Sequence, residues 1–273
     1  MIFRILKNPR LWGYGLIVVL ILAALYTLGA YVYAQAHLRP IKPQTPVSQL
    51  TSPTTWRPSV FSYIHQTNER QRMLTKSKRY NGFEIDTYTI PGERQIYVAH
   101  DSRQFKNKMT LPAVFSIPKE PANAFFWIDM KTPLTQQQID DIKEIARVVG
   151  VPLQNLIFEP PYTHDETAKL LVKNGLNVIL LVTGFEKNLS QEKTEKLVQK
   201  TKQRIEEIHP LAISSGMGIY PYLAAYFPNY YKAICYNTTK RPSLKKFFMR
   251  RAIQKKDPSV IMFLNDEYNW DNF

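Results

Sequence analysis

Two carboxylates and a histidine lie close together in one short stretch of the sequence. Residues 79–101 read as two strands joined by a tight turn that contains Pro and Gly. Because side chains alternate along a strand, Glu84 and Asp86 share one face, and His100 lies near the end of the second strand. An uncompensated buried charge costs ~3–5 kcal/mol, so these carboxylates need a cation. The stretch therefore gives the first indication of a metal site.

A second group of polar residues falls at the ends of other strand-like runs. Asp129 and Lys131 share one face of residues 125–131, and His65 and Glu159 each close a run of their own. Taken singly, each of these patterns is typical of a surface ion pair or a turn. Their placement at successive strand ends is what favours a functional site.

The residue types together indicate one chemistry. Three carboxylates offer oxygen ligands to Mg²⁺ or Ca²⁺: Glu84, Asp86 and Asp129. Lys131 supplies a fixed positive charge for an anionic group, and His65 and His100 are candidates for base and acid. Such a set suits a phosphodiester, because cations neutralise the non-bridging oxygens while the histidines move protons. Further candidates for contacting the substrate are Asn68, Glu159 and Trp270.

These residues can form one site only if the fold brings the ends of several strands together. Strand-like runs alternate with helical stretches along the chain, which predicts a parallel sheet with crossover helices. Thr135 and Gln138 form a capping box for a helix that Gly150 stops. The hairpin at residues 79–101 is expected to supply the second and third of eight parallel strands. We therefore predict a (β/α)8 barrel, with an open doubly wound sheet as the alternative.

The beginning of the chain is apolar between basic residues. Residues 11–34 carry no charge and exceed the about 20 residues that span a bilayer, with Arg4, Lys7 and Arg10 before them. This pattern predicts a single-pass anchor with a cytoplasmic N-terminus and an extracytoplasmic barrel, in a bacterium on the periplasmic side of the inner membrane. A cleaved signal peptide is the alternative. The expected organisation is anchor 1–36, Pro-rich linker 37–58 and barrel domain 59–273.

The charge balance limits the partners. The formal net charge is +14, and the barrel domain remains basic without the anchor. A basic domain beside a membrane favours anionic headgroups or phosphate-bearing substrates, and no nucleic acid is expected outside the cytoplasm. The single cysteine, Cys235, excludes an internal disulfide.

Four motifs of the site carry a resemblance to a known family: His65-Gln-Thr-Asn68, Gly82-Phe-Glu-Ile-Asp86, His100-Asp101 and Trp127-Ile-Asp-Met-Lys-Thr132. The set is similar to the phospholipase C-like phosphodiesterase superfamily, which includes glycerophosphodiester phosphodiesterases and sphingomyelinase D of the spider-venom type. The resemblance implies a (β/α) barrel, an acid/base pair at His65 and His100, a phosphate contact at Lys131 and a role in lipid metabolism. It also implies the same three metal ligands.

The sequence therefore predicts a membrane-anchored, divalent-metal-dependent phosphodiesterase, a hydrolase or lyase acting on a phospholipid headgroup or an envelope phosphodiester. One alternative is a catalytically inactive barrel that binds phosphorylated ligands or acts as an envelope scaffold. Another is a metal-dependent hydrolase of a different bond, such as a glycan deacetylase.

Overall fold

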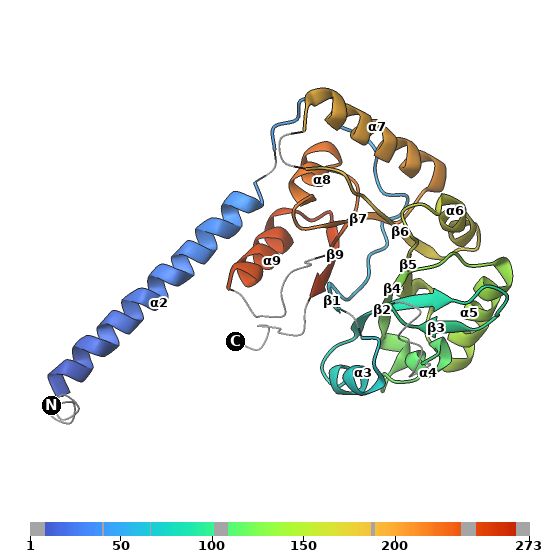
Figure 1. Cartoon of the computed structure of the whole chain (residues 1–273), viewed down its shortest axis with the longest axis horizontal. Coiled ribbons are helices and arrows are strands. Elements are labelled where there is room, and N and C mark those ends of the chain that lie inside the picture. The colour runs from blue at the N-terminus through green and yellow to red at the C-terminus, as the bar shows by residue number, and fades with distance from the viewer. Residues whose placement is uncertain are drawn as a thin grey trace.

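Eight parallel strands form a closed barrel in the part of the chain that the structure describes (Figure 1). The structure is a computed structural model that describes residues 9–39, 41–65, 67–100, 109–186, 189–235 and 244–265. The predicted (β/α)8 barrel is thereby confirmed. The barrel strands are β1 (Ser62–Ile64), β2 (Gly82–Thr89), β4 (Phe125–Met130), β5 (Leu156–Glu159), β6 (Asn177–Leu181), β7 (Ala212–Gly216), β8 (Lys232–Cys235) and β9 (Val260–Asn265).

The barrel closes where the first strand meets the second. Ile64 of β1 pairs with Phe83 of β2, while β1 pairs on its other side with β9. This closure rules out the open sheet. Gly82 is required at the join, because a Cβ at this position would lie 2.5 Å from the carbonyl oxygen of Ser62. The absence of a side chain therefore lets the two backbones approach.

Side-chain alternation separates the interior of the barrel from its outer face. Phe83, Ile85 and Ile128 pack outward against the helices, on the face opposite the acidic side chains of the same strands. Tyr63 and Trp127 belong to the inner cluster, where their rings meet edge to face with centroids 6.1 Å apart. The polar residues that alternate with the outward positions on β2 and β4 are therefore directed into the barrel.

Helices cover the outside of the barrel (Figure 1). Helix α5 begins at the predicted capping box, in which Thr135 accepts from the backbone of Gln138, and ends at Gly150 in a left-handed conformation. The helices are the N-terminal α2 (Pro9–His37), then α3 (Arg70–Lys76), α4 (Leu111–Phe115), α5 (Gln136–Val149), α6 (Asp165–Lys173), α7 (Gln191–Ile208), α8 (Tyr220–Tyr226) and α9 (Leu244–Lys256).

The second strand of the predicted hairpin lies outside the barrel. β3 (Ile96–Val98) pairs antiparallel with the far end of β2, with Tyr88 opposite Tyr97. The expectation that this hairpin supplies two barrel strands is therefore wrong. Strands joined by a tight turn run antiparallel, whereas neighbouring parallel strands need a longer crossover. β4 takes the place beside β2 instead.

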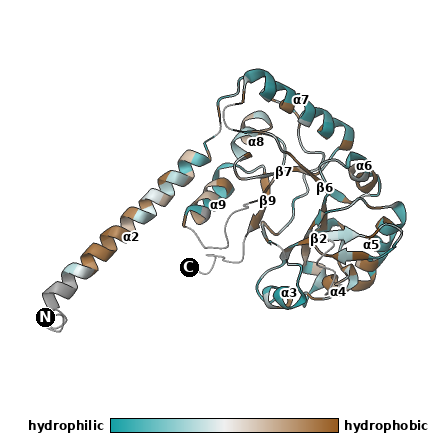
Figure 2. Ribbon diagram, viewed as in Figure 1, coloured by the Kyte–Doolittle hydropathy of each residue, from teal (hydrophilic) through white to brown (hydrophobic). Residues whose placement is uncertain are grey.

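The N-terminal helix α2 (Pro9–His37) projects from the barrel (Figure 1). Its residues Tyr14–His37 are long and apolar enough to cross a membrane. Of the 16 exposed large hydrophobic side chains that the structure describes, all but Val148 and Leu153 lie on this helix, and its middle is strongly apolar in Figure 2. Among its described side chains, those of the last turns pack on the domain, where Ala34 and the following Leu38 join a cluster with α9. The helix therefore leaves most of its apolar surface uncovered.

The Pro-rich segment that follows (residues 41–58) lies against the barrel rather than extending away from it. The backbone N–H of Ser48 donates to the carbonyl of Tyr226 at 2.8 Å, and the Tyr231 N–H donates to the Ser52 hydroxyl at 2.6 Å. A guanidinium N–H of Arg57 donates to a carbonyl at the start of β9, at 2.9 Å. The segment thus crosses the amino-terminal end of the barrel and does not act as a free spacer.

A buried lysine marks this amino-terminal end. Lys232, the first residue of β8, has an exposed fraction of 0% and donates to the Tyr230 carbonyl at 3.0 Å and the Ser259 hydroxyl at 2.5 Å. Its one recorded acidic neighbour among the described residues is Asp257, at 3.9 Å. Burial lowers the pKa of Lys232 to about 8, and the charge of Asp257 offsets only part of that effect.

Candidate metal centre at the barrel mouth

Three acidic residues form a row across neighbouring strands at the carboxyl end of the barrel. In the strand register, Asp86 of β2 is level with Asp129 of β4, and Asp129 is level with Glu159 of β5. Glu84 lies two residues below Asp86 and faces the same way. These four acids and Lys131 are called the mouth cluster below.

Lys131 is the cation of the mouth cluster. Its ammonium group contacts Asp86 at 2.6 Å and also binds Asp129. The side chain of Asp86 is only 2% exposed, so this ion pair is largely desolvated. Burial lowers the pKa of Lys131, but the charges and hydrogen bonds of Asp129 and Asp86 outweigh it and raise the pKa above its usual value. Lys131 is therefore a protonated donor.

The loop after β1 orients the ligands on β2. The side chain of Asn68 donates to a carboxylate oxygen of Asp86 and accepts from its backbone N–H at 2.8 Å. Thr67 binds the backbone carbonyl of Glu84 through both its N–H and its hydroxyl. Asn68 thus holds a metal-ligand candidate in place, a role different from the predicted contact with substrate. His65 starts this loop directly after β1, and its carbonyl accepts from Arg72 at 2.6 Å.

Glu159 is held from two sides inside the barrel. The indole N–H of Trp127 donates to one carboxylate oxygen at 2.7 Å, and the Ser214 hydroxyl binds the other. Burial, followed by repulsion from Asp129, raises the pKa of Glu159 to about 7, although both hydrogen bonds lower it. Glu159 is therefore a carboxyl group whose charge changes near neutral pH.

The antiparallel strand β3 brings His100 back to the mouth. The N–H of Ala99 donates to the carbonyl of Asp86 at 3.0 Å, so His100 follows immediately beside the acidic row. His100 is exposed, and its charge acts on Asp129, whose pKa is raised chiefly by burial and lowered by Lys131 and His100. Although β3 is not a barrel strand, its antiparallel direction brings His100 back to the rim of the barrel, beside Asp86.

The three predicted ligands fit a divalent cation. Glu84, Asp86 and Asp129 each place a carboxylate oxygen within 4.8 Å of the other two. Glu84 and Asp86 are buried and Asp129 is half-buried. Hard oxygen donors at such spacing are the ligands that Mg²⁺ and Ca²⁺ prefer, and three carboxylates exceed the charge that one lysine compensates. The acidic triad can therefore hold a metal ion.

The structure brings most of the predicted site residues together. The mouth cluster, Asn68 and His100 are joined by contacts or by charge, and His65 lies at the end of β1 next to them in the fold. Trp270 lies outside the described residues. Sequence reasoning missed Ser214, because one serine on a barrel strand carries no signal until its neighbour across the barrel is known. Trp127 could have been found from the alternation that pairs it with Asp129.

Comparison with known proteins does not support the predicted family. No family model matches the chain, and no curated protein matches it. A solved structure described as a "putative mandelate racemase" from Mesorhizobium loti aligns with 77% of this chain at 12% identity and a TM-score of 0.43. This chain spans about half of that protein, since the alignment covers 51% of it.

The resemblance to phospholipase C-like phosphodiesterases is therefore corrected. No family model and no curated protein points to such phosphodiesterases, and a solved structure that resembles this chain is described by another enzyme name. The predicted family, the phosphodiesterase activity and its role in lipid metabolism are therefore contradicted. The alternative of an inactive barrel for phosphorylated ligands gains no support either. The racemase itself lends no activity to this chain, because a likeness at this TM-score is too weak to carry one.

Proposed function

We propose that the chain is a membrane-anchored enzyme that uses a divalent cation to act on a carbonyl group, stabilising negative charge on its oxygen. The row of Asp86, Asp129 and Glu159 with Lys131 bound to two of its members carries this proposal. A divalent cation bound there would lie beside the protonated Lys131, at the rim where barrel enzymes have their chemistry.

The charge balance favours a neutral substrate. Glu84, Asp86 and Asp129 contribute three negative charges and Lys131 one positive charge, while Glu159 is partly protonated near neutral pH. One divalent cation would bring the cluster close to neutrality. A carbonyl compound that gains charge only during the reaction suits such a site better than a substrate that already carries charge.

The site residues then have the following roles. A bound divalent cation would polarise the substrate oxygen, with Glu84, Asp86 and Asp129 as its ligands. Lys131 donates a hydrogen bond to the developing oxyanion and keeps its own proton. His100, beside the row, transfers the proton that the reaction moves, and His65 is the second candidate for this task. Asn68 positions Asp86, and Trp127 positions Glu159.

The proposed location rests on α2. Its exposed apolar surface needs lipid, and Arg4, Lys7 and Arg10 precede its apolar residues, which supports a cytoplasmic N-terminus and an extracytoplasmic barrel. Membrane insertion of the full chain is checked by carbonate extraction, and its orientation by protease access from each side. Full digestion of the barrel from the cytoplasmic side would overturn this orientation.

Cation binding is the first test. The full chain in detergent, stripped with a chelator, is titrated calorimetrically with Mg²⁺, Mn²⁺ and Ca²⁺. We expect one site, and Asp129→Asn should weaken it at least ~10-fold because a charged ligand is lost. Asp140→Asn, which removes an exposed carboxylate on α5, is the matched control and should bind as the wild type does. Absence of saturable binding in the wild type would disprove the cation site.

Turnover is the second test. Acyl esters and N-acetylated sugars are assayed with and without chelator, beside a phosphodiester. We expect chelator-sensitive turnover of a carbonyl substrate, and a loss of about 10²-fold or more in kcat for Lys131→Met. Turnover of the phosphodiester alone, or activity that survives chelation, would contradict the proposal.

A further inference from the structure

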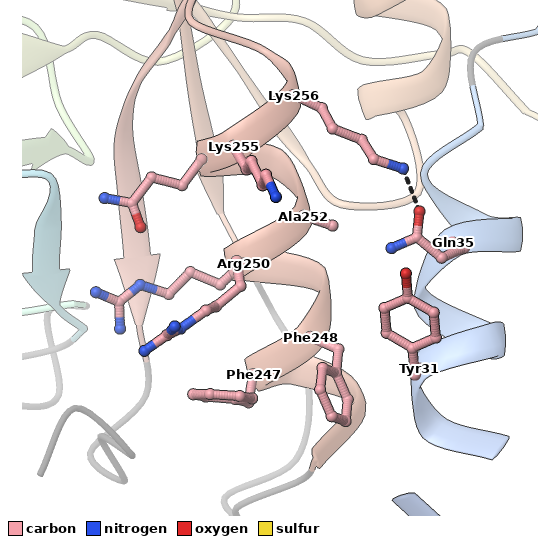
Figure 3. Close-up of a pocket in the computed structure, with 10 residues that line it drawn as sticks. Tyr31, Gln35, Phe247, Phe248, Arg250, Ala252, Lys255 and Lys256 are labelled. Atoms are coloured by element: carbon pink, nitrogen blue, oxygen red, sulfur yellow. Dashed lines mark hydrogen bonds between the residues drawn. The ribbon is translucent and has the colours of Figure 1, made fainter. Parts of the chain in front are cut away.

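A cleft lies on the outside of the barrel, between the end of α2 and helix α9 (Figure 3). Its volume is about 720 Å³. Tyr31 and Gln35 line it from α2, and the facing wall consists of aromatic and basic residues of α9. The mouth cluster does not contribute to it. The lining residues of α9 used below are Phe247, Phe248, Arg250, Arg251, Lys255 and Lys256.

The cleft lies at the level where α2 would leave a membrane. A hydrocarbon core of about 30 Å takes about 20 helical residues, which from Tyr14 reaches the region of Tyr31 and Tyr33. Tyrosine is enriched at this boundary. Gln35 is one turn further along and falls among the headgroups. Ala30 and Ala34 are buried one turn apart, so small side chains let α9 pack closely here.

The two walls of the cleft match this polarity. Figure 3 shows Phe248 beside Tyr31 and Lys256 beside Gln35, so α9 presents its aromatic end toward the apolar part of α2 and its basic end away from it. The rings of Tyr31 and Phe248 meet edge to face with centroids 5.6 Å apart, and Lys256 donates to the Gln35 side chain. Tyr31 and Phe248 thus lie at the hydrocarbon boundary, where Lys245 also lies over the ring of Tyr33, and Lys256 lies at the headgroup level.

The charge of α9 is of one sign. The helix contains no acidic residue, and Arg251, Lys255 and Lys256 are exposed. Arg251 lies over the ring of Phe247 at 5.1 Å, a contact that positions the guanidinium group without neutralising it. Guanidinium and ammonium groups in such an array are typical partners of a phosphate group.

We propose that the cleft binds the headgroup of an anionic phospholipid, with the phosphate between the cations of α9 and the acyl chains along the exposed face of α2. The proposal rests on the membrane location of α2 but not on the reaction at the barrel mouth. It differs from attraction to a charged bilayer in general, because a single lipid has a defined place between an aromatic and a basic wall.

Spin-labelled lipids test this site. The full chain is placed in phosphatidylcholine nanodiscs with trace spin-labelled phosphatidylglycerol or phosphatidylcholine, and the motionally restricted fraction is measured. One basic contact near the surface is equivalent to about fivefold in affinity, so we expect about fivefold selectivity for phosphatidylglycerol. Selectivity close to one is expected after the combined substitutions R251Q, K255Q and K256Q, which change exposed residues only.

The control removes the same charge elsewhere. K193Q, K196Q and K200Q change three exposed lysines of α7, a helix away from the cleft in Figure 1. This variant should keep the wild-type selectivity. Equal association of both lipids with the wild type would overturn the proposal, and so would an equal loss in both triple variants, which would indicate net charge alone. Displacement of the labelled lipid by millimolar inorganic phosphate would also overturn it, because the cleft would then be a site for a soluble anion.

Discussion

Lys131 and Lys232 are both poorly accessible, but they lie at opposite ends of the barrel and differ in what surrounds them. Lys131 meets two carboxylates at the mouth, which raise its pKa despite burial. Lys232 meets mainly neutral oxygens at the amino-terminal end, and burial lowers its pKa to about 8. The mouth thus has more negative charge than its lysine compensates, whereas the opposite end provides little to stabilise a charge.

This difference separates function from stability. A surplus of carboxylates is costly unless a cation arrives, so the mouth is arranged for a ligand. The amino-terminal end is closed by the Pro-rich segment and satisfies its lysine internally. The same division is general in (β/α)8 barrels, where chemistry occupies the carboxyl ends of the strands.

The largest expected effect comes from removing the mouth lysine. Lys131→Met leaves Asp86 buried without its cation, so the free energy of unfolding should fall by ~3–5 kcal/mol. Mg²⁺ should raise the Tm of this variant more than that of the wild type, because the ion replaces the missing charge. Lys169→Met, which removes exposed ion pairs, should change stability by less than ~1 kcal/mol. Equal Mg²⁺ shifts in Lys131→Met and the wild type would argue against the surplus of charge.

Lys232, at the amino-terminal end of the barrel, should make the free energy of unfolding depend on pH. Because the pKa of Lys232 is about 8 in the folded chain against 10.5 ordinarily, the folded state loses its proton first as the pH rises. The free energy of unfolding should therefore increase between pH 8 and 10.5, by at most ~3 kcal/mol. Denaturant titrations at both ends of this window, compared with Lys232→Met, isolate the effect. If the free energies of unfolding of the wild type and Lys232→Met differ by the same amount at both pH values, the lowered pKa of Lys232 is excluded.

Glu159 should show the opposite slope. Its pKa is raised to about 7 from 4.5, so the folded state keeps the proton to higher pH than the unfolded state does. The stabilising contribution is complete below pH 4.5 and is lost as the pH rises through 7, a change of at most ~3 kcal/mol. Glu159→Gln keeps the shape and should remove this pH dependence. An unchanged pH profile in the variant would show that folding does not raise the pKa of this carboxyl group.

The smallest expected effect is at helix α5, away from both ends of the barrel. Thr135→Ala removes the side-chain cap of α5 and should lower the free energy of unfolding by about 1 kcal/mol at any pH between 5 and 9. Thr135→Ser keeps the hydroxyl and serves as the control. Cation binding at the mouth should be the same in both variants, and a change in it would mean that the mouth depends on this helix.

The faces of the strands and the start of helix α5 could be predicted from the sequence, because both depend on residues close together in the chain. Alternation placed Glu84 and Asp86 opposite Phe83 and Ile85, and the capping box at Thr135 set the start of α5. Which strands become neighbours depends on contacts through space, so the register of Asp86 with Asp129 and Glu159 was not available from the sequence. The same holds for Ser214.

Two errors have a physical origin of the same kind. The segment of residues 41–58 looked like a spacer because proline favours extended backbone, but extended backbone can equally lie on a surface that offers donors and acceptors, such as Tyr226 and Tyr231. The predicted reaction was wrong because carboxylates, a lysine and histidines serve many reactions on barrels. The residue types indicated a metal site but did not specify which bond of a substrate would react.

In the proposed membrane location, the attachment of residues 41–58 would set how the barrel mouth meets its ligands. A flexible tether of this length would let the barrel sample a thick layer above the bilayer and turn in any direction. With the segment bound across the barrel and α2 packed against α9, the mouth would instead be held at one height and one tilt. Encounter would then become a search within a thin layer of fixed depth, in which molecules that lie at that depth meet the mouth repeatedly and others rarely reach it.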